Sequence, residues 1–160
     1  MEVKTLKYTG TLIAVKNIEK SKQFYHDVLG LDVMADFGAN VTLTGGVVLQ
    51  TLETWQSFIH TNDVTLKSNA GELYFETEDM DVFYKHLESF DINYVHELHE
   101  HPWGQRVVRF YDLDGHIIEA AEKLDAVIAR FVAQGLSPEE TAVRMGIPLD
   151  FVVSSLSEAK

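Results

Sequence analysis

Two glutamates, Glu72 and Glu119, stand in short, largely apolar runs of the chain. Carboxylates in such a place bind a divalent cation, or take a proton from a carbon atom next to a carbonyl group. Without a metal, two carboxylates that share a poorly solvated pocket repel each other, so we expect one of them to have a raised pKa. Both glutamates are candidate catalytic residues, set against the commoner case of a strand glutamate that is simply solvated.

An internal repeat gives each glutamate an equivalent in the first half of the chain. The matching segments are GVVLQ (46–50) with GHIIE (115–119), and GTLIAVKNI (10–18) with ELYFETEDM (72–80). Gln50 is therefore equivalent to Glu119, and Gly10 to Glu72. A repeat of this length, with strands and a helix in each copy, predicts a duplicated βαβββ module rather than a solenoid of short repeats.

Hydrophobic periodicity predicts one helix and four strands in each module. The first module has a helix over 18–29 that Gly30 ends, and strands over 8–16, 31–37, 41–44 and 47–52. The second has a helix over 79–90, and strands over 72–77, 94–97, 106–111 and 116–121. The polar stretch 52–69 has no clear period and is predicted to link the modules, which span residues 6–54 and 70–122.

Strand alternation then sorts the polar residues by face, because side chains two apart lie on the same side of a sheet. Glu72, Tyr74 and Glu76 are expected on the face away from the helix, and the same parity applies to Gln50 and Glu119. If the modules pack edge to edge, the two glutamates and their two equivalents converge on one concave face.

These residues carry a resemblance to a known family. The phrases VKNIEKSKQFYHDVLGL, GELYFETEDMDVFY and HPWGQRVVRFYDLDGHIIE resemble the vicinal oxygen chelate superfamily, which includes glyoxalase I, bleomycin-resistance proteins and extradiol dioxygenases. The resemblance implies an α+β fold in which two βαβββ modules form a cupped mixed sheet within a domain of residues 1–122. Residues 123–160 are expected to form a helical C-terminal extension.

The resemblance also implies a divalent metal in the cup, held at positions that correspond here to Gly10, Gln50, Glu72 and Glu119. Gly10 has no side chain to offer, and Gln50 supplies a neutral amide where an acid is usual. The remaining oxygen ligands, Gln50, Glu72 and Glu119, are an incomplete set that suits Mg²⁺ or Mn²⁺ better than Ni²⁺ or Zn²⁺. The alternative, which the missing ligand favours, is a metal-free cavity in which the glutamates bond to Tyr74, Gln50 or water.

Residues 96–106 form the other segment with chemical potential. Strand parity predicts that His96 lies on the opposite side from His99 and His101, which favours an exposed hairpin over a metal site. In proteins of the resembling family this segment borders the ligand cup, so Trp103 is a candidate to stack on a planar ligand, and Arg106 to meet a ligand carboxylate. The alternative is a tight turn with Trp103 packed on the core.

The C-terminal extension is predicted to be helical throughout. Ala126, Ile128 and Phe131 form an apolar helix face, and Ser137-Pro138-Glu139-Glu140 is a strong helix start. The spacing of the later helices faintly resembles a helix-turn-helix, but acidic residues outnumber basic ones here, which argues against binding to DNA. We expect the extension to pack on the domain, to cover an edge strand or to form a dimer contact.

Composition limits the partners. The formal net charge of −12 argues against nucleic acid and anionic membranes, and the chain has no cysteine and no apolar N-terminal stretch. We therefore expect a cytoplasmic protein, a homodimer, that binds a small molecule. Two functions stay open: a non-catalytic, metal-free binder of a small aromatic or cationic molecule, and a divalent-metal-dependent lyase, isomerase or dioxygenase. Loss of a ligand at Gly10 favours the binder.

Overall fold

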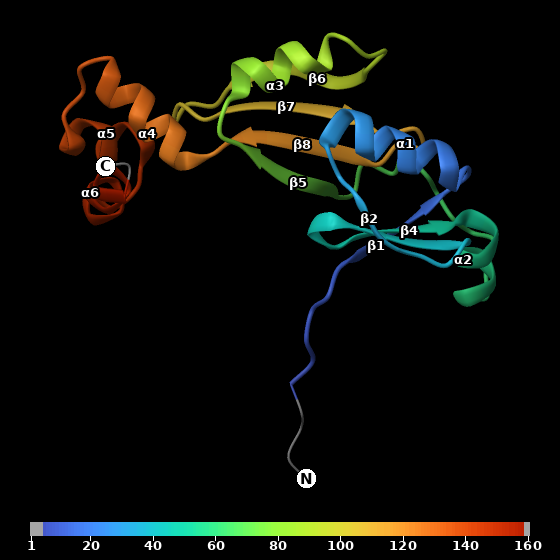
Figure 1. Cartoon of the computed structure of the whole chain (residues 1–160). Helices are drawn as coiled ribbons and strands as arrows, with labels where there is room; N and C mark the ends of the chain where they lie inside the picture. The colour runs from blue at the N-terminus through green and yellow to red at the C-terminus, as the bar shows by residue number, and fades with distance from the viewer. Residues whose placement is uncertain (1–4, 159–160) are drawn as a thin grey trace. The chain divides into compact units, whose positions relative to one another are not determined.

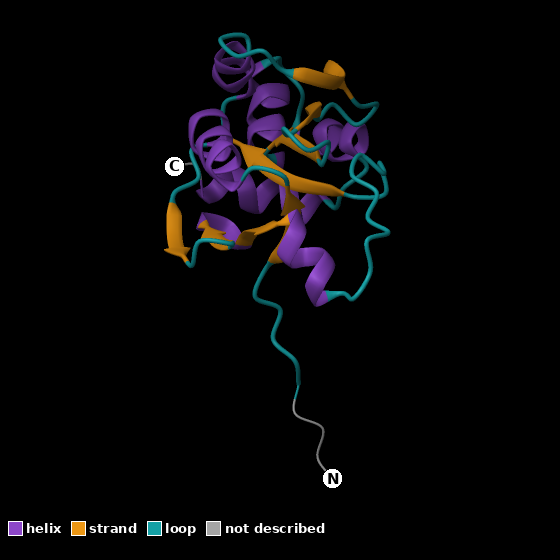
Figure 2. Ribbon diagram, turned by 90° about the vertical axis from the view of Figure 1, so that its right-hand side faces the viewer, coloured by secondary structure: helices purple, strands orange, loops and turns teal. Residues whose placement is uncertain are grey.

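The structure is a computed structural model that describes residues 5–158 of the 160-residue chain. It divides into two compact units, each of which combines a sheet with helices (Figure 2). Unit 1 comprises the described residues up to 68 together with residues 112–115, and unit 2 comprises residues 69–111 together with the described residues from 116 onward. The sequence-based division at residue 122 stays a prediction, and the chain ends that it includes lie outside the described residues.

Unit 1 contains the first βαβββ module. Its elements are β1 (Thr11–Val15), α1 (Ile18–Leu29), β2 (Val33–Asp36), β3 (Asn40–Leu43), β4 (Val47–Thr51) and α2 (Leu52–Phe58). The strand order is β1-β4-β3-β2, with β1 parallel to β4 and the other pairs antiparallel. The predicted linker is wrong in part, because its first seven residues form α2.

Helix α1 has the predicted bounds because both of its ends carry strong capping signals. The Asn17 side chain accepts a hydrogen bond from the Lys20 amide, and Gly30 ends the helix in the left-handed region at φ 69°. On the buried side of α1, the Tyr25 hydroxyl donates to Asp112 Oδ2 at 2.8 Å. Just before the helix, the Lys16 amide donates to Asp114 Oδ1 at 3.2 Å. The turn 112–115 is thus bonded within unit 1.

Unit 2 repeats the same plan. Its elements are β5 (Glu72–Thr77), α3 (Met80–Leu87), β6 (Asn93–Glu100), β7 (Arg106–Tyr111) and β8 (Ile117–Glu122). The order β5-β8-β7-β6, with β5 parallel to β8, matches that of unit 1 strand for strand. The predicted α+β fold with two βαβββ modules is therefore confirmed. Strand β6 is longer than predicted, and α3 is shorter.

The C-terminal helices of unit 2 are α4 (Leu124–Ala133), α5 (Pro138–Met145) and α6 (Leu149–Glu158), drawn orange to red in Figure 1. Helix α5 starts at a capping box in which the side chains of Ser137 and Glu140 each bond the other's backbone amide. The three helices share an apolar core, which consists of Val127, Ile128, Phe131, Ala142, Met145 and Val152. This core holds the helices together as a small bundle.

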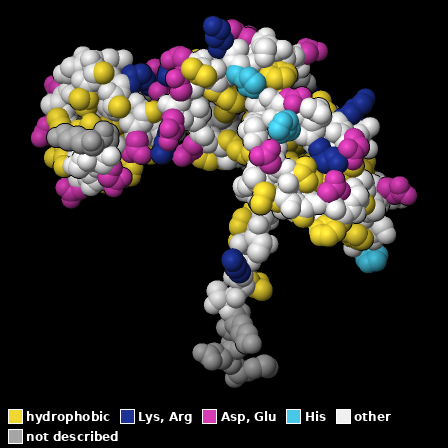
Figure 3. Space-filling model, viewed as in Figure 1, with side chains coloured by type: hydrophobic (Ala, Val, Ile, Leu, Met, Phe, Trp, Pro, Cys, Tyr) yellow, Lys and Arg dark blue, Asp and Glu magenta, His cyan; other side chains and the backbone are white. Residues whose placement is uncertain are grey.

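The surface reflects the composition. Figure 3 shows acidic side chains over the visible faces of both units, with fewer Lys and Arg side chains among them. No helix within residues 5–158 has both the length and the apolar character needed to cross a membrane.

Candidate ligand-binding site

One face of the unit 2 sheet gathers polar side chains from all four strands. Cross-strand partners point to the same side of a sheet, and the register aligns Tyr74 with Glu119, Glu119 with Arg109, and Arg109 with His96. We call this surface the polar face. Its members from the strands are Glu72, Tyr74, Glu76, His96, His99, Arg109 and Glu119. The prediction that Glu72, Tyr74 and Glu76 share a face with Glu119 is confirmed.

Arg109 lies at the centre of the polar face, between the two glutamates. Its Nε donates to Glu72 Oε2 at 2.8 Å, and its Nη2 donates to Glu119 Oε2. Its Nη1 lies 3.3 Å from His96 Nε2, which accepts this hydrogen bond when the imidazole is neutral. Sequence reasoning missed Arg109. The alternation of side chains along its strand is a signal that could have found it, because Arg109 lies on the same face as its cross-strand partner Glu119.

The two glutamates differ in their environment. The hydrogen bond from Arg109 lowers the pKa of Glu72. Burial, with the nearby Glu72 carboxyl, raises the pKa of Glu119 to about 7, and only 5% of the residue is exposed. The prediction that one of the two carboxyl groups has a raised pKa is thus confirmed. Near neutral pH, Glu119 is therefore present in both its protonated and its ionised form.

The histidines of β6 lie on one side, contrary to the prediction. The pairing of β6 with β7 shifts between Tyr94 and His96, and again between His96 and His99. Each irregularity changes the parity of the residues after it, which brings His96 and His99 to the same face. Their ring centroids are 6.2 Å apart, and those of His99 and His101 are 5.5 Å apart. Burial, with Arg109 nearby, lowers the pKa of His101.

Two larger aromatic rings belong to this region of unit 2, Trp103 next to His101 and Tyr74 on β5 beside Glu119. The Trp103 ring stacks on His101 at 4.2 Å, and its Nε1 donates to Gln105 Oε1 at 3.1 Å. Trp103 remains 40% exposed, so it does not pack inside the core. Tyr74 is 53% exposed and donates from its hydroxyl to Glu76 Oε1 at 3.0 Å. A flat molecule can reach both rings from solvent.

Arg106 lies on the opposite side of its strand from Arg109. It donates to Asp81 Oδ1 at 2.8 Å and to Glu122 Oε1 at 3.0 Å. Because both carboxylates hold its guanidinium within unit 2, the predicted contact of Arg106 with a ligand stays a prediction that this arrangement does not favour.

The two remaining predicted positions belong to unit 1. Gln50 is 2% exposed, and its Oε1 accepts a hydrogen bond from Asn40 Nδ2 at 2.7 Å while its Nε2 donates to Thr54. At Gly10, an added Cβ would clash with the carbonyl oxygen of Gly46. Position 10 therefore has no room for a side chain unless the backbone moves, and the amide of Gln50 is already bonded.

These donors do not fit a divalent metal of the kind that the resemblance implies. Among residues 5–158, no group of three or more His, Asp or Glu side chains is arranged to hold a metal ion. In unit 2 the oxygens of Glu72 and Glu119 are bonded to the guanidinium of Arg109, which also places a positive charge between them.

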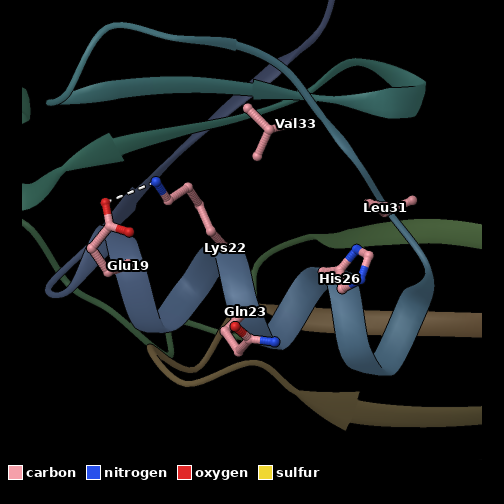
Figure 4. Close-up of a pocket in the computed structure, with 6 residues that line it drawn as sticks. All are labelled: Glu19, Lys22, Gln23, His26, Leu31 and Val33. Atoms are coloured by element: carbon pink, nitrogen blue, oxygen red, sulfur yellow. Dashed lines mark ion pairs between the residues drawn. The ribbon is translucent and has the colours of Figure 1, made fainter.

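A separate groove in unit 1 lies between α1 and the start of β2 (Figure 4). Its volume is about 180 Å³, smaller than a typical ligand pocket. In Figure 4, Lys22 extends to Glu19, with Nζ 2.8 Å from Oε1, and Lys22 also pairs with Asp36 at 2.8 Å. Because the charge of Lys22 is already paired, the groove is a weaker candidate site than the polar face.

Comparison with known proteins is consistent with this fold. The model of the glyoxalase-like domain family matches residues 8–125. A crystal structure of a protein of unknown function from Agrobacterium tumefaciens str. C58 is 32% identical, with a TM-score of 0.68 over 76% of this chain and 97% of that chain. No curated protein matches the sequence significantly.

Two more distant structures share the fold. A glyoxalase/bleomycin resistance protein/dioxygenase from Nocardioides is 17% identical, with a TM-score of 0.60 over 76% of this chain and 85% of that chain. A lactoylglutathione lyase from Agrobacterium tumefaciens is 22% identical, with a TM-score of 0.57 over 76% of this chain and 96% of that chain. At these identities the likeness shows the architecture alone.

Proposed function

This chain belongs to the glyoxalase-like domain family, and from that premise we propose that its polar face binds a small, planar organic cation without a resident divalent metal. The observation that carries the proposal is the ion pairing of Arg109 with both Glu72 and Glu119.

Arg109 substitutes for a metal by satisfying the glutamate oxygens. A divalent ion would have to displace the guanidinium from both carboxylates, and then find further ligands nearby. Glu119 is buried, and Arg109 is the cation that partly offsets the cost of burying its charge. We infer that this carboxylate pair holds its own arginine in preference to a cation from solution.

The charge of the polar face favours a cationic ligand. The strands of the polar face carry three carboxyl groups and one guanidinium: Glu72 and Glu119 bond Arg109, and Glu76 accepts from the Tyr74 hydroxyl. The excess negative charge attracts a cation, while carboxylate oxygens accept hydrogen bonds from its N–H groups.

The rings of the polar face favour a flat ligand. Trp103 and Tyr74 are both partly exposed, and aromatic faces attract cations and stack on planar rings. In this proposal Tyr74 and Trp103 contact the ligand, as the sequence predicts, and Arg109 takes the place of Arg106 as the arginine of the site. Gln50 stays a predicted ligand-binding residue, with its amide bonded in unit 1.

Ethidium is a suitable probe because it is planar and permanently cationic. We expect chelator-treated protein to bind ethidium, and Trp103→Ala and Tyr74→Ala to bind it more weakly. Tyr84→Ala is the matched control, because it removes the same ring from α3, away from the polar face. Equal binding of the planar anion naphthalene-2-sulfonate, or loss of ethidium binding in the control alone, would contradict the proposal.

A second function, metal-free proton transfer, is favoured by the pKa of Glu119, which burial raises to about 7. Here the Glu119 carboxylate takes a proton from a carbon next to a carbonyl group. The C–H electron pair moves to the carbonyl oxygen, which accepts hydrogen bonds from Arg109, and the same carboxylic acid returns the proton. Glu72 orients Arg109 through its ion pair.

Hydrogen exchange separates this function from simple binding. If the site is catalytic, dihydroxyacetone in D₂O with chelator present should exchange its carbon-bound hydrogens faster with the wild type than with Glu119→Gln. Equal rates, at the level of buffer alone, leave the binder as the function. The homodimer also stays a proposal, which sedimentation equilibrium tests by mass.

A further inference from the structure

The C-terminal bundle lies against the loop 101–105, which joins β6 to β7 and carries Trp103. We propose that helix α4 positions this loop for ligand binding, with Arg130 and Phe131 as the positioning residues. The inference rests on the proposed function, because it assigns a role to residues that the ligand does not touch. Helices α5 and α6, which hold α4 through the shared core, lie beyond the residues 8–125 that match the family model.

Arg130 connects α4 to the loop 101–105, to the end of β6 and to the end of β8. Its Nη2 donates to the carbonyl oxygen of Gly104 at 2.5 Å and to Glu122 Oε2 at 2.9 Å. Its Nη1 lies 3.7 Å from Glu100 Oε2, at the end of β6. One guanidinium therefore fixes the loop relative to the last residues of β6 and β8, with the directional strength of charge-assisted hydrogen bonds.

Phe131 restrains the loop by contact. Gly104 has φ +93°, and an added Cβ would clash with the Phe131 ring. The loop itself is tight, since the Gly104 amide donates to His101 O at 2.8 Å and the His101 amide donates to Gln105 O at 2.9 Å. A glycine is required at position 104 both for its backbone conformation and for the approach of the ring.

The restraint reaches the polar face through Gln105. Its Nε2 donates to the backbone oxygen of Glu122 at 2.8 Å, and its Oε1 accepts from Trp103 Nε1 at 3.1 Å. Trp103 in turn stacks on His101. Because Glu122 is bonded both to Arg130 and to Gln105, a displacement of α4 is transmitted to the ring that borders the site.

The test uses the emission of Trp103 in a Trp55→Phe background, where it is the remaining tryptophan. We expect Arg130→Met to shift this emission and to weaken ethidium binding roughly tenfold, because Trp103 is no longer held in its position for the ligand. Arg144→Met is the matched control. It makes the same chemical change on α5, where the guanidinium also lies over the Phe131 ring, at 5.9 Å. The control should leave both readouts unchanged.

Arg130→Lys keeps the test decisive if the methionine variant does not fold. Lysine retains a positive charge opposite Glu122 but lacks the fork that also reaches Gly104 O. We expect it to restore thermal stability without restoring the Trp103 emission. Wild-type emission and wild-type affinity in the folded Arg130 variants, or the same shift in Arg144→Met, would overturn the inference.

The two proposals fail in different ways. Trp103 emission is recorded without ethidium, so it reports the loop position whether or not the probe binds. Wild-type protein that binds no ethidium contradicts the proposed function, whereas unaltered emission in Arg130→Met contradicts the positioning role of α4.

Discussion

Arg109 Nε lies 2.8 Å from Glu72 Oε2, at the centre of the sheet face that carries both glutamates. Glu119 completes the arrangement from the neighbouring strand through its own bond to the guanidinium. Both glutamates that the resemblance matches to metal ligands lie in unit 2, and Arg109 is ion-paired with each of them. The effects of this pairing on stability, metal binding and ligand binding can be measured.

Replacing the arginine should destabilise the protein. Arg109→Met leaves Glu72 and Glu119 without their shared partner, and hydrogen bonds to charged groups contribute about 1.5–3 kcal/mol each. We expect the free energy of unfolding in urea to fall by about that amount at pH 8. Lys22→Met, which breaks two exposed ion pairs in unit 1, should change it by less than about 1 kcal/mol. Equal effects would mean that the pairing around Arg109 contributes no more than a surface salt bridge.

Metal titration tests the same relationship directly. We expect calorimetry of chelator-stripped protein to show no stoichiometric binding of Mn²⁺, Mg²⁺, Ni²⁺ or Zn²⁺ at the two glutamates, because Arg109 occupies their oxygens. Glu119→Gln should therefore give the same trace as the wild type. A stoichiometric site that this variant abolishes would show that a metal displaces the arginine.

The ionisation of Glu119 should make stability depend on pH. Its pKa is about 7 in the folded protein, above the ordinary glutamate value of 4.5, so the folded state binds the proton more tightly than the unfolded chain. This contribution to stability is present below pH 4.5 and is lost as pH rises to about 7. Glu119→Gln should flatten that part of the stability curve. A carboxyl titration by NMR with a midpoint below 5 would contradict the assignment.

Ethidium affinity should follow the same ionisation. As pH rises from 6 to 8, Glu119 gains its negative charge and the polar face becomes more acidic, so binding of a permanent cation should strengthen several-fold. The dependence should disappear in Glu119→Gln. An unchanged pH profile in that variant would contradict the assignment of this dependence to Glu119.

Gly104 should tolerate substitution less well than another glycine of similar conformation. Gly104 and Gly135 have φ +93° and +98°, but a Cβ meets the Phe131 ring only at Gly104, with nothing within 4 Å at Gly135. Backbone strain of about 1–3 kcal/mol is common to both alanine variants. Gly104→Ala should therefore lower the melting temperature further than Gly135→Ala does. Equal losses would show that the ring contact adds nothing.

Much of the fold follows from local signals in the sequence. Helix α1 was predicted with its observed bounds because Asn17 and Gly30 cap it, and β5 and β7 because their alternating or apolar runs are bounded by turns. Helix α2 was missed because seven residues give too short a pattern to show a helical period. Repeat matching was right for Glu119, since Gln50 pairs with Asn40 as Glu119 pairs with Arg109. It was wrong for Glu72, which pairs with Ile117 as Leu12 pairs with Val48, so Leu12 and not Gly10 is its equivalent.

The site itself needed tertiary information. The irregularities in β6 have no local sequence signal, so parity gave the wrong side for His96. Arg109 reaches Glu72 across the intervening strand β8, and a pattern along one strand does not reveal a contact of that range.

The turn between β7 and β8 bears on how the chain unfolds. The chain passes from unit 1 to unit 2 near residue 68, returns for residues 112–115, and then leaves unit 1 again. Tyr25 and Lys16 bond this turn inside unit 1, while the strands on either side of it belong to unit 2. Melting unit 1 removes the hydrogen bonds that hold the turn between β7 and β8. The duplicated halves should therefore lose their structure in a single cooperative transition, even though each has a sheet of its own.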